Sequence, residues 1–152
     1  MRQRLFRTFR LALCVCVFAH TRRAAAADQQ ERVQRVVEDL KARLSITQAV
    51  SVAVVPANPK LFSVVPESGK AGAFLLSVEE DFAQGLTEPE LRAAVAHELG
   101  HVWIFTHFPY LQTEQLANDI AARVVSRDSL DPLYDKVWAK AGSDSAYSRQ
   151  DH

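Results

Sequence analysis

Residues 97–101 read His-Glu-Leu-Gly-His, an HExxH sequence whose residue types and spacing could do chemistry. On a helix with 3.6 residues per turn, His97 and His101 lie one turn apart on the same face, so both imidazoles can reach one metal ion. Glu98 lies about 100° further round the helix, where its carboxylate can approach a water molecule beside the metal without being a ligand. This pattern is typical of metal-assisted hydrolysis.

The residues before the motif predict a helix that runs from Glu88 to about residue 105. Thr87 is a suitable N-cap, and Glu90, three residues later, completes a capping box. Pro89 is tolerated in a first helical turn, and acidic residues there favour the positive end of the helix dipole. The histidines are therefore expected in the interior of a well-started helix.

The composition of this helix indicates which face is buried and where another backbone approaches. Gly lowers helix propensity by about 1 kcal/mol relative to Ala, so Gly100 indicates a close approach of another backbone or of a substrate. The alternative is an ordinary amphipathic helix whose histidines face solvent. We expect a buried apolar stripe on the side away from the histidines, formed by Leu91, Val95, Leu99 and Val102.

A catalytic zinc site normally has three protein ligands and an open fourth position, so a third ligand is needed. Two residues compete for it: Glu114, and His107, which has the spacing from His101 of the metzincin motif HExxHxxGxxH. In that motif a glycine breaks the helix, but here the position is Ile104, which does not readily adopt positive φ. Met1 is the only methionine, which excludes a Met-turn. The sequence therefore favours Glu114.

A returning helix is expected over residues 113–127, with Glu114 in its first turn. Asn118 lies one turn later on the same face, where its side-chain oxygen could accept from the outer N–H of a ligating histidine and fix the tautomer. Ala117 is small enough to let this helix pack closely against Gly100. A solvated glutamate on an ordinary helix is the alternative interpretation of Glu114.

The remaining patterns predict an α+β fold with a small three-stranded sheet. We expect an amphipathic helix over residues 29–44, strands over 51–55, 61–65 and 73–78, and a last short helix over about 132–141. The third strand comes shortly before the HExxH helix. It is expected either to form the sheet edge beside the site, where an extended peptide could add as a strand, or to be a core strand.

Two segments together resemble the gluzincin metallopeptidases, in particular the HtpX-like and CAAX-endopeptidase branch. They read ELRAAVAHELGH over residues 90–101 and ExxANxxA over 114–121, and the likeness covers about residues 58–127. Asn118 stands where this family usually has Asp, and only twelve residues separate His101 from Glu114, fewer than usual. The resemblance implies a zincin-like fold with one Zn²⁺ held by His97, His101 and Glu114, Glu98 as general base, and the third strand as the substrate edge.

A zinc-dependent metallopeptidase of this kind would act on peptide or protein substrates. Glu98 would take a proton from the attacking water and pass it to the leaving amine. A cationic or phenolic donor should stabilise the oxyanion. The sequence does not choose among four candidates for this donor, His107, Tyr110, Arg123 and Tyr134.

Two other classes stay open at this point. A zincin-like module could bind a metal or a peptide without proteolysis, and a fourth ligand, for which His107 is the nearby candidate, would indicate structural zinc. An exported interaction module without metal is the third possibility.

Charge and composition divide the 152 residues into three parts: a signal peptide over 1–27, a metallopeptidase domain over 28–142, and a polar tail over 143–152. The first part has six arginines, no acid, an apolar run over residues 11–19, and small residues before Asp28. Nine apolar residues are too few to span a bilayer, so we expect export to the periplasm or exterior, with an uncleaved amino-terminal anchor as the alternative.

The mature chain would have no cysteine, because Cys14 and Cys16 both lie in the first part. It would therefore have no disulfide and no thiolate ligand. Its remaining 12 basic and 18 acidic residues give a net charge of −6, which argues against nucleic acid as a partner.

Overall fold

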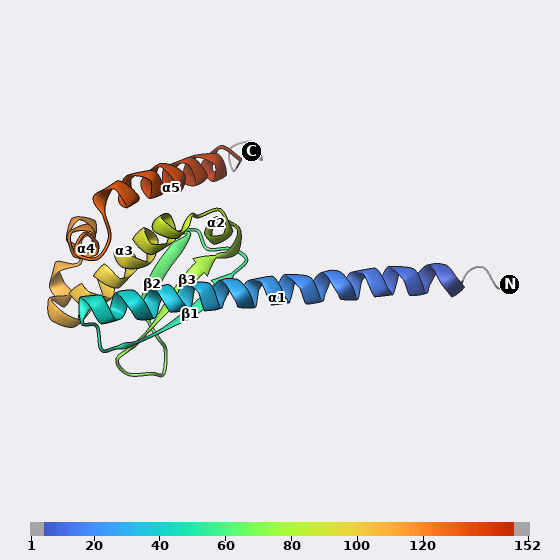
Figure 1. Cartoon of the computed structure of the whole chain (residues 1–152), viewed down its shortest axis with the longest axis horizontal. Helices are drawn as coiled ribbons and strands as arrows, with labels where there is room; N and C mark the ends of the chain where they lie inside the picture. The colour runs from blue at the N-terminus through green and yellow to red at the C-terminus, as the bar shows by residue number, and fades with distance from the viewer. Residues whose placement is uncertain (1–4, 148–152) are drawn as a thin grey trace.

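A three-stranded mixed sheet with helices packed on it forms the framework of the computed structural model, which describes the backbone of residues 5–147 and the side chains of residues 25–140 and 142 (Figure 1). The elements in chain order are α1 Leu5–Leu44, β1 Ala49–Val55, β2 Phe62–Pro66, β3 Ala73–Glu79, α2 Glu80–Gln84, α3 Glu88–His107, a 3₁₀ turn Pro109–Leu111, α4 Glu114–Ala121 and α5 Arg127–Tyr147. The expected α+β class is confirmed.

The strand order is β1-β3-β2, with β3 parallel to β1 and antiparallel to β2. Of the two expectations for residues 73–78, the sheet edge is therefore wrong and the core strand is confirmed, because β3 is the central strand. Its near-continuous apolar sequence suits a strand with neighbours on both sides. The edge nearest the HExxH helix is β2, and Pro66 at its end fits an edge strand because proline cannot donate to a ladder.

One face of the sheet is buried, and the other is partly exposed. Alternate residues of β3, among them Leu76 and Val78, are fully buried, whereas Ser77 between them is only half-buried. This period of two is typical of a sheet that packs on one face. The side chains that meet it form one core, and helix α1 contributes Val33, Val37 and Leu40 to that core.

Helix α3 begins and packs as its sequence predicts. Glu90 accepts a hydrogen bond from the backbone N–H of Thr87 at 2.8 Å, which closes the capping box. The expected apolar stripe is confirmed, because Leu91, Val95, Leu99 and Val102 are all fully buried.

Helix α2, the end of α4 and both ends of α5 differ from expectation. Helix α2 was missed, because the acidic residues after β3 begin a short helix in which Glu79 caps the N–H of Phe82 at 2.5 Å. Helix α4 ends at Ala121, after which the chain closes tight turns such as Val124 N–H to Ala121 O at 3.0 Å. Helix α5 begins five residues earlier than predicted and continues through Gly142 to Tyr147, because Gly142 does not adopt the positive φ that ends a helix.

The predicted signal peptide falls largely within α1, which continues without a break from Leu5 to Leu44. Figure 1 shows the amino-terminal part of this helix extending beyond the rest of the molecule. Among the described helices, none combines the length and hydropathy that crossing a bilayer requires. Cleavage before Asp28 stays a prediction, as does the tail, whose residues 148–152 lie outside the described part.

Candidate metal centre

Helices α3 and α4 bring His97, His101 and Glu114 together at one point. His97 Nε2 lies 3.1 Å from Glu114 Oε2, His101 Nε2 lies 3.6 Å from Glu114 Oε1, and the two Nε2 atoms are 3.2 Å apart. Two ligands about 2.0–2.1 Å from a tetrahedral ion lie about 3.3 Å from each other. These separations, which involve the two Nε2 atoms and both oxygens of one carboxylate, are therefore close to the spacing of ligands around one ion.

The donor set also fits a metal ion. Two imidazole nitrogens and one carboxylate oxygen are the ligands of many catalytic zinc sites, and three protein ligands leave one position open. Within the described part of the chain, the His, Asp, Glu and Cys side chains that lie close enough together to hold an ion are His97, His101 and Glu114. Their ligand atoms lie within 4.8 Å of one another. The Glu114 side chain is 80% exposed, so solvent can reach this group of side chains.

Both histidines are oriented by an amide side chain on their outer nitrogen. Asn118 Oδ1 lies 2.7 Å from His97 Nδ1, which is the contact that the sequence predicted. Gln112 Oε1 lies 3.1 Å from His101 Nδ1, and its Nε2 donates to the His101 carbonyl at 3.1 Å. Such partners fix the ring orientation and leave Nε2 free for a metal.

Sequence reasoning missed Gln112. It lies in the connection between α3 and α4, where no helical periodicity relates it to His101. The signal that could have found it is its position two residues before Glu114, because the chain must return to the histidines there.

Glu98 is a nearly buried carboxylate beside the two histidines, with 9% of its surface exposed. Burial raises the pKa of Glu98 above its ordinary range, while His97, His101 and the backbone N–H of Val64 act in the opposite direction. A raised pKa suits a group that must accept and then release a proton near neutral pH.

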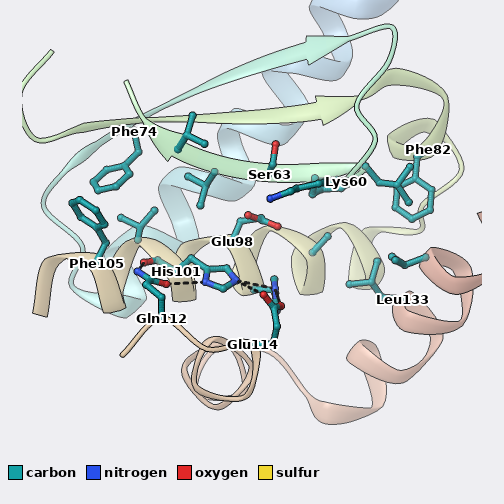
Figure 2. Close-up of a pocket in the computed structure, with 18 of the residues that line it drawn as sticks. Lys60, Ser63, Phe74, Phe82, Glu98, His101, Phe105, Gln112, Glu114 and Leu133 are labelled. Atoms are coloured by element: carbon teal, nitrogen blue, oxygen red, sulfur yellow. Dashed lines mark hydrogen bonds and ion pairs between the residues drawn. The ribbon is translucent and has the colours of Figure 1, made fainter. Parts of the chain in front are cut away.

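A cavity of about 530 Å³ lies between β2, α3 and α5, with Glu98 directed into it (Figure 2). One end is apolar and is lined by Phe82 and Leu133. At the other end, Phe74 and Phe105 pack edge to face with ring centroids 5.4 Å apart. The cavity can therefore hold an extended chain with apolar side chains beside Glu98.

Of the four candidate transition-state donors, Tyr134 of α5 lines this cavity and the other three do not. His107 stacks on Trp103 with centroids 4.0 Å apart, and Arg123 lies over the same ring. Tyr110 is 98% exposed. Burial raises the pKa of Tyr134 above its ordinary value, so its phenol is protonated at neutral pH.

His107 is also absent from the metal group, and its Nδ1 lies 2.8 Å from the Trp103 carbonyl. Helix α3 continues to this residue, and a continuous helix carries His107 round to another side. The structure therefore places His107, the alternative third or fourth ligand, outside the group of His97, His101 and Glu114.

At the sequence level, no family model and no curated protein matches the chain. The structure is similar to the crystal structure of the metallopeptidase zymogen of Pyrococcus abyssi abylysin, with a TM-score of 0.51 and 19% identity. The similarity covers 71% of this chain and 93% of that chain. The chain has a metallopeptidase-like fold. In this chain the candidate metal group lies on the two helices that the gluzincin resemblance indicated.

Proposed function

We propose that this protein is a zinc-dependent metallopeptidase in which His97, His101 and Glu114 hold the ion and Glu98 is the general base. The observation that carries the proposal is the convergence of the two Nε2 atoms and the Glu114 carboxylate, with N–N and N–O separations of 3.1 to 3.6 Å, beside the buried carboxylate of Glu98 in a cavity. The metallopeptidase-like fold supports it independently.

The chemistry divides between the ion and the chain. When bound, zinc supplies Lewis acidity, which lowers the pKa of a water molecule towards 7 and polarises the scissile carbonyl. Glu98 accepts a proton from the attacking water and delivers it to the leaving amine. Asn118 and Gln112 hold the two imidazoles in the orientation that directs each Nε2 towards the ion.

The proposed substrate is an extended peptide that adds to the open edge of β2. Glu79 N–H donates to Leu61 O at 2.8 Å, so Leu61 and every second residue after it bond to β3. The alternate residues Phe62 and Val64 direct their carbonyl groups towards the cavity, where a peptide could donate to them. The β2 edge takes the place of residues 73–78, which the gluzincin resemblance implied as the substrate edge.

The decisive experiment measures zinc content and peptide cleavage on the same preparation of the full chain. We expect about one zinc per chain and cleavage of casein or a peptide library that a chelator abolishes. Glu98→Gln should retain zinc and lose cleavage, whereas Glu31→Gln on the exposed face of α1 should retain both. Zinc without cleavage in the wild type would favour the alternative of a metal-binding or peptide-binding module.

We also propose that the protein is exported, with the segment over residues 1–27 as its signal. Determining the amino-terminal residue of the protein recovered from outside the cytoplasm tests this. Asp28 is expected, and Met1 in that sample would favour an uncleaved anchor.

A further inference from the structure

Tyr134 and His97 share one oxygen atom. The Tyr134 hydroxyl forms a hydrogen bond with Asn118 Oδ1, and the same oxygen lies 2.7 Å from His97 Nδ1. Tyr134 belongs to α5, whereas Asn118 belongs to α4 and His97 to α3. Three helices therefore meet in one chain of polar contacts that ends at a candidate metal ligand.

The direction of each hydrogen bond follows from the chemistry of metal binding. For His97 to offer the Nε2 lone pair to an ion, its proton must be on Nδ1. Nδ1–H is then a donor, so Asn118 must present its oxygen and not its NH₂ group. Because Tyr134 contacts that same oxygen, its hydroxyl must donate as well. Both lone pairs of Oδ1 are then used.

We propose that Tyr134 is a positioning residue that acts through Asn118 on His97, and that it is not the donor to the oxyanion. This inference rests on the proposed function, because it assumes that His97 is a metal ligand. In the observed geometry the phenolic proton is directed to Asn118, so it is not available to a substrate in the cavity.

The contact from Tyr134 affects His97 because residue 118 is an asparagine, whose amide can adopt two orientations. A carboxylate at residue 118 would present an oxygen to His97 in either orientation, whereas an amide rotated by 180° presents two N–H donors to the N–H of His97. In the rotated state the Tyr134 oxygen could only accept from the amide N–H, so the phenolic proton would lose its acceptor Oδ1 while the His97 N–H would face a second donor. Tyr134 therefore favours the amide orientation in which His97 can bind a metal.

The metal site would then depend on the docking of α5, a helix outside the two ligand motifs. Lys136, two residues after Tyr134, holds α5 to the first turn of α3 through Glu90 Oε2 at 2.8 Å and to the end of α2 through the Gly85 carbonyl at 3.1 Å. Leu133, on the other side of Tyr134, is buried in the core. These contacts place the Tyr134 ring at the cavity wall.

The test measures zinc affinity of the purified full chain by competition with a chromogenic chelator. Tyr134→Phe removes only the hydroxyl, so the ring and the fold are retained. We expect its zinc affinity to fall roughly 3- to 10-fold, less than the 10- to 100-fold typical of losing a ligand's own partner, because one bond intervenes. Tyr110→Phe removes a hydroxyl that is 98% exposed and should leave zinc affinity unchanged.

A second background separates this role from a general structural one. In Asn118→Asp, an oxygen faces His97 in either orientation, so adding Tyr134→Phe should change zinc affinity less than about 2-fold. Equal losses of zinc affinity on adding Tyr134→Phe to the wild type and to Asn118→Asp would overturn the inference. A lower melting temperature of metal-free Tyr134→Phe that accounts for its loss of zinc affinity would overturn it as well.

The outcomes also distinguish this inference from the proposed function. Unchanged zinc affinity with a reduced kcat in Tyr134→Phe would make Tyr134 the oxyanion donor and overturn the inference alone. A wild-type chain that binds zinc but cleaves no peptide would overturn the proposed hydrolase, while the affinity changes would still support the positioning role. A wild-type chain that binds no zinc would overturn both.

Discussion

Gly100 of α3 contacts the backbone of Ala117 of α4 so closely that a Cβ atom at residue 100 would lie 2.6 Å from the Ala117 carbonyl oxygen. The same Cβ would be 3.0 Å from the Ala117 Cα. Gly100 lies between the two histidines, and Ala117 lies one turn after Glu114. The absence of a side chain at residue 100 therefore sets how closely the Glu114 carboxylate can approach the imidazoles.

Gly100→Ala should destabilise the protein and weaken metal binding together. The substitution gains up to about 1 kcal/mol of helix propensity, but overpacking against backbone atoms costs about 1–3 kcal/mol and displaces α4. We expect a lower urea midpoint and a loss of zinc affinity. Gly142→Ala in α5, where a Cβ meets nothing within 4 Å, is the matched control and should not destabilise. A Gly100→Ala protein with wild-type stability and zinc affinity would contradict the close approach.

Glu114→Ala should abolish tight zinc binding without unfolding the chain. Removing a partner of a ligand costs about 10- to 100-fold in affinity, so removing the ligand itself should cost more than about 100-fold. The side chain is 80% exposed, so the free energy of unfolding of the metal-free protein should change by about 0.5 kcal/mol or less. Isothermal titration with zinc measures the affinity, and Asp119→Asn on the same helix is the control. Retained affinity in Glu114→Ala would remove Glu114 from the site.

Gln112→Ala and His107→Ala should differ in their effect on zinc. Gln112 contacts both the ring and the carbonyl of His101, so its loss should lower zinc affinity about 10-fold or more. His107 stacks on Trp103 away from the ligand group, so its loss should leave zinc affinity unchanged. Chelator competition on both variants tests this pair, and the reverse ranking would restore His107 as a ligand.

Glu90 should make stability depend on acid pH. The hydrogen bond from Lys136, supported by those from Thr87, lowers the pKa of Glu90 from 4.5 to about 2 against the effect of burial. Because the folded-state pKa is the lower one, this stabilisation is complete above about pH 4.5 and is lost as the pH falls towards 2. Glu90→Gln should therefore be less stable than wild type at pH 7, with a smaller difference at pH 3. Urea unfolding at both pH values measures this, and a difference independent of pH would contradict it.

Most of the metal group could be predicted from the sequence because helical spacing is a local property. His97 and His101 lie on one face of any helix that contains them, and the Thr87 and Glu90 pattern indicated where that helix begins. Glu114 and Asn118 have the same spacing on α4, and the small residues Gly100 and Ala117 indicated where the two helices meet.

Only the tertiary structure decided three features of the protein. These are the strand order, the residue that contacts Nδ1 of His101, and the tyrosine that contacts Asn118. β3 is central and β2 forms the edge because burial summed over the whole core sets the strand order, which the short turns between strands do not reveal. Gln112 reaches His101 across a connection without periodicity. Tyr134 reaches Asn118 because Leu133 and Lys136 dock α5 against α3. Contacts between segments distant in sequence depend on how all the buried surfaces fit at once, and no local spacing encodes that fit.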